Sequence, residues 1–180
     1  MKRALIVFGV LVVAAGSVFA AQQGFKIIKE SLTGYQEVPV VSTTGHAEFS
    51  ARISNDESSI EYSLSYDDLQ GSVQQSHIHV GQLSVNGGIS VFLCTNLGNG
   101  PAGTQACPQS GTISGVITAA DVSPNIPATA AARTQGVNTG ELAELIAAIR
   151  AGATYVNIHS TTWPGGEVRS QIDGNSGHQH

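Results

Sequence analysis

The stretch Gln75-Ser76-His77-Ile78-His79-Val80-Gly81 alternates polar and apolar side chains from His77 to Val80. Alternation with a period of two is typical of a β-strand, because successive side chains of a strand point to opposite faces. Ile78 and Val80 are then expected on the core face. His77 and His79 share the other face, with backbones about 6.6 to 7 Å apart. Two imidazoles at that spacing can bind one copper or zinc ion.

A second stretch, Tyr155-Val156-Asn157-Ile158-His159, has the same pattern about eighty residues later. Its apolar residues claim the core face, so His159 is expected on the polar face of its strand. Three imidazoles with an open fourth position form the arrangement of a catalytic zinc site, and imidazole suits copper equally well. The sequence therefore predicts a metal site of His77, His79 and His159. A hydrogen-bonded structural cluster on a solvated strand face is the alternative.

Arg169 lies ten residues after His159, across the turn Trp163-Pro164-Gly165-Gly166. This turn predicts a hairpin that brings Arg169 and Glu167 beside the histidine face. Arg169 could then guide an anion to a metal. The alternative is a surface salt bridge of Arg169 to Glu167 or Glu37.

The other histidines are weaker candidates. His46 opens a predicted strand near a glycine turn, where an exposed histidine needs no special explanation. His178 and His180 lie in a polar tail, residues 173–180, that we expect to be disordered and hence a poor metal site. The sequence contains no recognisable nucleophile motif, phosphate-binding loop or glycosidase pair.

The N-terminus has the features of an export signal. Lys2 and Arg3 precede an apolar run, and Val18-Phe19-Ala20 ends the segment with the small residues that a signal peptidase requires. We predict cleavage after Ala20 and a secreted or periplasmic protein, with no membrane contact once residues 1–20 are removed. A retained membrane anchor is the alternative, but the apolar run is short for a span of about 20 residues.

Composition limits the size and the partners of the exported part. Removing residues 1–20 leaves 160 of the 180 residues, which suits one domain with its own core. The full chain has 8 basic and 13 acidic residues, a net charge of −5, and loss of Lys2 and Arg3 makes the net charge −7. No basic cluster is present, so nucleic acid is not an expected partner.

Cys94 and Cys107 flank a loop rich in glycine, asparagine and proline. In an oxidising compartment they are expected to form a disulfide. A two-cysteine metal site is disfavoured because the loop contains no histidine. Closing a loop of this length contributes about 3 kcal/mol in the chain-entropy model.

About eight short strands with glycine-rich turns predict an all-β fold, an antiparallel Greek-key-like sandwich or barrel over residues 25–172. Leu142, Leu145, Ile146 and Ile149 repeat at helical spacing, which predicts one short helix near residues 139–151. We expect this helix to cover one open end or edge of the sheet. The predicted strands are Phe25–Leu32, His46–Ile53, 60–66, one carrying His77 and His79, Ile89–Leu93, Gly111–Thr118, Thr154–Ser160 and Glu167–Ile172.

Several motifs in a fixed order resemble the CHRD domain, a family named from chordin. They are Gly34-Tyr35-Gln36-Glu37-Val38-Pro39, Ser76-His77-Ile78-His79-Val80-Gly81, Asn86-Gly87-Gly88 and Ala151 to Arg169. The resemblance implies an extracytoplasmic all-β domain and no settled biochemical activity. Chordin antagonises bone morphogenetic proteins, but that role does not follow for a lone domain from its fold.

The order His77, His79, His159, Arg169 is also similar to the copper site of copper/zinc superoxide dismutases. The bridging histidine and the zinc-ligand loop of that family have no counterpart, because the loop between Gly81 and Gly111 lacks histidine. We therefore expect a binding or interaction module with a surface copper site, zinc being the less favoured metal. Its partner is an unknown extracytoplasmic protein or matrix component. A superoxide-dismutase-like copper redox enzyme is the alternative.

Overall fold

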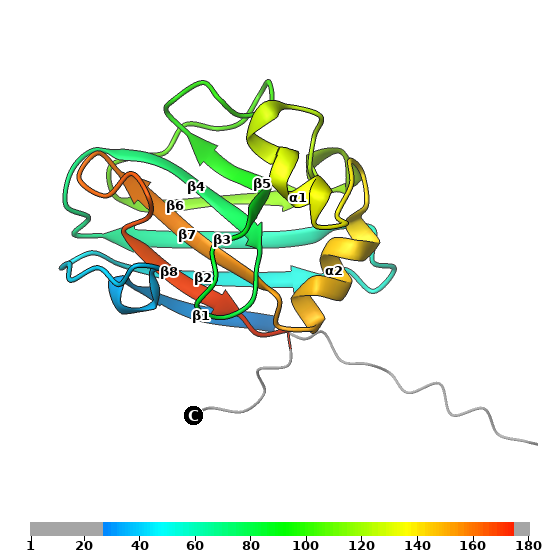
Figure 1. The fold of residues 1–180 in the computed structure, drawn as a ribbon, viewed down its shortest axis with the longest axis horizontal. Coiled ribbons are helices and arrows are strands. Elements are labelled where there is room, and N and C mark those ends of the chain that lie inside the picture. Colours follow the sequence, from blue (N-terminus) through cyan, green and yellow to red (C-terminus); the bar gives the residue numbers. More distant parts are fainter. Residues whose placement is uncertain (1–26, 175–180) are drawn as a thin grey trace, which may run out of the picture.

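The computed structural model describes residues 27–174, which form one eight-stranded antiparallel sheet that curls into a nearly closed barrel (Figure 1). The predicted all-β fold is thus confirmed. The start of the predicted first strand at Phe25, the export signal and the end of the tail lie outside the described residues. The strands are β1 (Ile27–Thr33), β2 (His46–Ile53), β3 (Ile60–Asp67), β4 (Val73–Val80), β5 (Gly88–Thr95), β6 (Gly111–Ile117), β7 (Thr154–Ser160) and β8 (Val168–Ile172).

The strand order is β5-β4-β7-β8-β1-β2-β3-β6, so β4 and β7, which carry the three candidate histidines, are neighbours in the middle of one half of the sheet. Their register pairs His77 with Asn157 and His79 with Tyr155. The hairpin of β7 and β8 pairs Asn157 with Arg169. Pairing in register puts these side chains on one face of the sheet.

The opposite face of the same strands forms the core inside the barrel. Ile78, Val156, Ile158 and Val168 are fully buried there and pack with Leu64 and other apolar residues from the far wall. Burial of apolar area at about 25 cal/mol per Å² is the main force that holds such a sheet closed. The core therefore fixes β4, β7 and β8 from within.

The helices lie at one end of the barrel (Figure 1). Helix α2 (Leu142–Arg150) falls within the range predicted from the sequence and buries Leu142, Leu145, Ile146 and Ile149. A second short helix, α1 (Ala130–Thr134), was not predicted, because the alanine-rich run has no apolar periodicity. Short 3-10 turns occur at η1 (Gly34–Gln36), η2 (Ala119–Asp121) and η3 (Pro127–Thr129). Among residues 27–174, no helix is long and apolar enough to cross a membrane.

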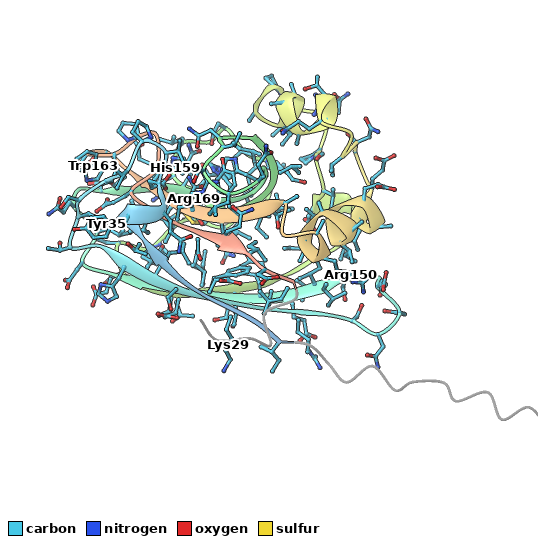
Figure 2. The ribbon with its side chains drawn as sticks, turned by 60° about the horizontal axis from the view of Figure 1, so that its bottom comes forward. Lys29, Tyr35, Arg150, His159, Trp163 and Arg169 are labelled. Carbon is cyan, nitrogen blue, oxygen red and sulfur yellow. A yellow bond between two sulfur atoms is a disulfide. The ribbon has the colours of Figure 1, made fainter. Side chains whose placement is uncertain are left out.

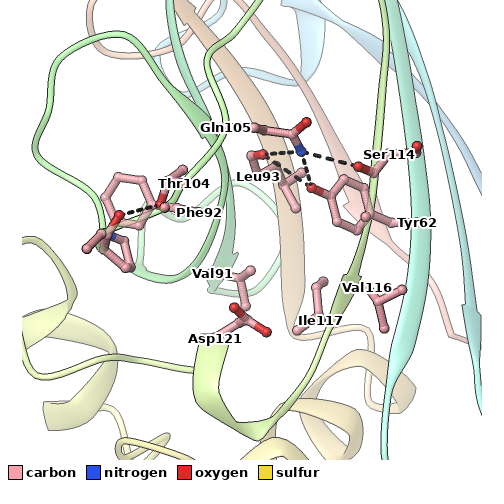
Figure 3. A pocket seen from close by; sticks show the side chains of 14 residues that line it. Tyr62, Val91, Phe92, Leu93, Thr104, Gln105, Ser114, Val116, Ile117 and Asp121 are labelled. Atoms are coloured by element: carbon pink, nitrogen blue, oxygen red, sulfur yellow. Dashed lines mark hydrogen bonds between the residues drawn. The ribbon is translucent and has the colours of Figure 1, made fainter.

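The barrel has one seam, between β5 and β6, the two ends of the strand order. The Gln105 amide bridges it by donating to the Leu93 carbonyl (3.0 Å), the Tyr62 hydroxyl (2.8 Å) and the Ser114 carbonyl (3.3 Å) (Figure 3). A cavity of about 290 Å³ lies along the seam. The loop that carries Gln105 is held by a disulfide between Cys94 and Cys107, which confirms the predicted pairing.

Candidate functional site

The three histidines predicted to form a site converge. His77 Nδ1 lies 3.3 Å from His159 Nε2, and the ring centroids of His77 and His79 are 5.3 Å apart. One nitrogen from each residue can be chosen so that all three lie within 4.8 Å of one another. The convergence follows from the register of β4 and β7, because both strands present these residues on the same face.

The cluster is buried, which corrects the expectation of a solvated face and a surface site. His77 is 0% exposed, His79 6% and His159 7%. Loops and turns cover this face of the sheet, among them the loop before β5 and the turn before β8. Figure 2 shows His159 and Arg169 on the side of the molecule where Tyr35 and Trp163 lie, away from Arg150 of α2.

Backbone carbonyls of these covering segments orient two of the imidazoles. Nδ1 of His79 lies 3.0 Å from the Gly87 carbonyl oxygen, and Nδ1 of His159 lies 2.9 Å from the Pro164 carbonyl oxygen. A side chain at residue 87 would clash with the backbone, since a Cβ there would lie 1.7 Å from the Val80 oxygen. Glycine at this position thus lets the loop approach His79 closely.

Burial keeps the three imidazoles neutral. Desolvation lowers the pKa of His79 to about 3, with smaller opposing effects from its hydrogen bonds. Desolvation also lowers the pKa of His159, and the pKa of His77 falls well below its usual range because of burial and the two neighbouring imidazoles. Neutral imidazole is the form that binds metal, so at pH 7 all three side chains are competent ligands.

Asn157, which the alternation of β7 placed on the same polar face as His159, lies at the centre of the cluster. Its Oδ1 is 3.1 Å from His79 Nε2 and 3.0 Å from His159 Nε2. Its Nδ2 donates to Glu37 Oε1 at 3.4 Å. The sequence signal was present, because Asn157 alternates with Val156 and Ile158 and so shares the polar face of β7.

Glu37 is buried as well, although the sequence suggested a surface residue. Desolvation raises the pKa of its carboxyl group to about 7, against the opposing effect of Arg169. Gly166, at φ +128°, makes room for this carboxyl group, because a Cβ there would lie 2.3 Å from Glu37 Oε1. The Pro164-Gly165-Gly166 turn and the Gly34 to Pro39 motif thus meet beside Asn157.

Arg169 reaches the cluster through Tyr155. The Tyr155 ring stacks on His79 with centroids 4.5 Å apart, and the Arg169 guanidinium carbon lies 3.4 Å from the Tyr155 centroid. Arg169 is 1% exposed and donates to Asn86 Oδ1 (3.1 Å) and the Val85 carbonyl (3.0 Å). These contacts tie the covering loop to the sheet. An anion-guiding role of Arg169 stays a prediction.

The remaining candidates lie elsewhere. Glu167 is buried beside β7, but its Oε1 accepts from Thr43 Oγ1 (2.7 Å) and from the backbone N–H of Gln70 (2.6 Å), away from the histidines. His46 is exposed at the start of β2. His178 and His180 lie outside the described residues. The rings of Phe92 and His77 meet in a T-shaped contact with centroids 4.5 Å apart. Phe92 also lines the seam cavity, so this side chain separates the cluster from the cavity.

Fold and site together define an antiparallel β domain with a disulfide-held loop and a buried polar cluster of three histidines. The family model of the CHRD domain matches residues 28–172, and the chain therefore belongs to the CHRD domain family. Neither the curated proteins nor the solved structures gave a match. The family resemblance seen in the motifs is confirmed, whereas a likeness to superoxide dismutases is not shown. A disulfide fits the extracellular setting in which CHRD domains occur.

Proposed function

We propose that this CHRD domain is an exported binding module in which His77, His79 and His159 hold a copper ion. The observation that carries the proposal is the convergence of three imidazole nitrogens within 4.8 Å at a buried position. The register of two core-anchored strands supports a preformed site, which avoids the entropy cost of ordering the ligands on binding. The partner of the module is proposed to be an extracytoplasmic protein or a matrix component.

The chemistry of the ligands supports copper over zinc. Imidazole binds both metals, and divalent copper generally binds more tightly than zinc at a given set of ligands. Three neutral imidazoles supply no negative charge, and a buried site penalises a higher ionic charge more strongly. Copper can be held as the singly charged ion, which zinc cannot adopt.

Elemental analysis tests the proposal. The full sequence is expressed with His178→Ala and His180→Ala, purified after export, freed of metal, loaded with copper or zinc and desalted. We expect about one equivalent of copper per chain, and a competing equivalent of zinc should not displace it. Less than a tenth of an equivalent of either metal would falsify the proposal.

A matched pair of variants locates the bound ion. His79→Gln removes a buried imidazole but keeps a polar side chain of similar length, and His46→Gln makes the same change at an exposed histidine. Copper binding should be lost in the first variant and kept in the second. Retention of full copper binding by His79→Gln, with a folded circular dichroism spectrum, contradicts the assignment of the ligands.

Copper redox chemistry with superoxide is the second candidate function. The observation in its favour is the positive charge of Arg169, which the single ring of Tyr155 separates from His79. The burial of that guanidinium group favours binding over redox chemistry, because its donors already bond Asn86 and Val85. We expect the copper-loaded protein to dismutate superoxide no faster than protein-free copper chelated by imidazole. Faster turnover that is lost in His79→Gln favours the enzyme.

A further inference from the structure

We propose that Asn157 is a fourth ligand of the metal, through Oδ1, and that this closes the coordination position that three histidines leave open. The inference rests on the proposed function, since it concerns the same ion. It changes what the site can do, because a site with four protein ligands holds its metal, whereas an open position is what catalytic sites offer to water or substrate.

Two backbone carbonyls fix the position of the hydrogen on two of the imidazoles. A carbonyl oxygen only accepts hydrogen bonds, so the nitrogen that faces it must carry the hydrogen. Nδ1 of His79 faces the Gly87 carbonyl, and Nδ1 of His159 faces the Pro164 carbonyl. A neutral imidazole carries one N–H, and therefore both Nε2 atoms are bare lone pairs.

The two lone pairs face a third acceptor. Both point at Asn157 Oδ1, at 3.1 Å and 3.0 Å, and an amide oxygen is also an acceptor. None of these three atoms, the two Nε2 atoms and Oδ1, carries a hydrogen that it could donate to another of them. An acceptor oxygen buried about 3 Å from each of two acceptor nitrogens is repelled by both, and a cation among them removes the repulsion. Nδ2 of the same amide donates to Glu37 Oε1 at 3.4 Å.

The spacing of the candidate ligand atoms also fits a metal ion. Nitrogen and oxygen ligands lie about 2.0 to 2.1 Å from an ion such as zinc, so neighbouring ligands are about 2.9 Å apart at right angles and about 3.4 Å apart in a tetrahedron. Three separations in the cluster, 3.0, 3.1 and 3.3 Å, fall in this range. They link Asn157 Oδ1 with His79 Nε2 and His159 Nε2, and His159 Nε2 with His77 Nδ1. These separations are those expected of ligands that share one small ion.

The surroundings fit a closed site. His77 is packed against Phe92, and its Nε2 is buried without a hydrogen-bond partner, so the cluster has no polar opening on that side. Tyr155 covers His79 from the other side. A water or anion that completed the coordination would have to be buried with the metal, and Asn157 Oδ1 already occupies that place.

Copper(II) with azide and deuterated water as probes tests the inference on the exported protein. In the copper-loaded chain we expect no azide-to-copper charge-transfer band and no deuterium coupling from bound water in pulsed electron paramagnetic resonance. Asn157→Ala should show both signals and bind copper about 10- to 100-fold more weakly. Asn157→Asp, which keeps an oxygen at the same place, should show neither. Asn99→Ala, the same change at an exposed asparagine, should behave as the unchanged chain.

The outcomes separate the two proposals. If the unchanged chain binds no copper, the proposed function fails and this inference with it. If it binds copper but already coordinates azide or water, Asn157 is not a ligand and the three-histidine site stands. If Asn157→Ala weakens copper binding without admitting either probe, Asn157 is a positioning residue and the inference is overturned. If Asn157→Ala does not fold, the azide and water measurements on the unchanged chain still test whether the fourth position is closed.

Discussion

Strands β3 and β7 belong to one sheet and share one core, yet they differ on their outer faces. Along β3, buried apolar residues alternate with outer residues such as Glu61 and Ser65 that face water. Along β7 every residue is buried, including the outer Tyr155, Asn157 and His159. A solvated polar side chain costs little, whereas a buried one must be satisfied by partners. The outer face of β7 is therefore the place where polar residues need an explanation.

The largest effect is expected from removing the buried charge of Arg169. Arg169→Ala takes away a buried guanidinium that stacks on the buried ring of Tyr155 and bonds Asn86 of the covering loop. We expect a loss of about 3 to 5 kcal/mol in the free energy of unfolding, measured by urea denaturation of the metal-free chain.

Arg52→Ala is the matched control on the solvated side. Its salt bridge to Glu61 joins side chains that are 41% and 55% exposed, and such pairs contribute about 0 to 1 kcal/mol. Equal losses in the two arginine variants would erase the contrast between the two faces.

Acid should act on the histidine face. Each of the three histidines has a lowered pKa in the folded chain, so the unfolded chain binds more protons below about pH 6.5. The free energy of unfolding should then rise with pH between 4.5 and 6.5. Glu37 opposes the trend, because its pKa is raised to about 7 in the folded chain. The net slope stays positive, because three histidines act against one carboxyl group.

Urea denaturation of the metal-free chain at several pH values measures this slope, and His79→Gln should reduce it. The cost of keeping His79 neutral is absent above pH 6.5 and grows as the pH falls. A flat profile between pH 4.5 and 6.5 means that the histidines are solvated in solution, as the outer residues of β3 are.

The smallest effect is expected at the seam, where β5 and β6 end the strand order. Gln105→Ala removes the amide that joins Leu93, Tyr62 and Ser114, and we expect a loss of about 1 kcal/mol together with faster hydrogen exchange in β5 and β6. Thr112→Ala, on the paired side of β6, is expected to stay within about 0.5 kcal/mol. If Gln105→Ala lowers the free energy of unfolding by several kcal/mol, the barrel is not held mainly by its strand pairs.

Local pattern was enough to predict most of the fold. The range predicted for β2, His46–Ile53, and that for β7, Thr154–Ser160, agree with the structure, because alternation and flanking turns are encoded within each strand. Helix α2 was predicted from its apolar spacing. Helix α1 was not, because alanine fits both a helix and a loop.

The site was only partly predictable. Alternation along two strands was enough to bring His77, His79 and His159 to one face. Their burial was not, because it depends on loops distant in the sequence that cover this face, and no local pattern encodes that packing. The burial of Glu37 has the same origin.

Anomalous diffraction from crystals of the copper-loaded protein tests the central claim most directly. We expect one strong copper peak about 2.0 to 2.1 Å from a nitrogen of each of His77, His79 and His159. A strongest peak at His46 or another surface residue, or no peak at the cluster in the presence of excess copper, would contradict it.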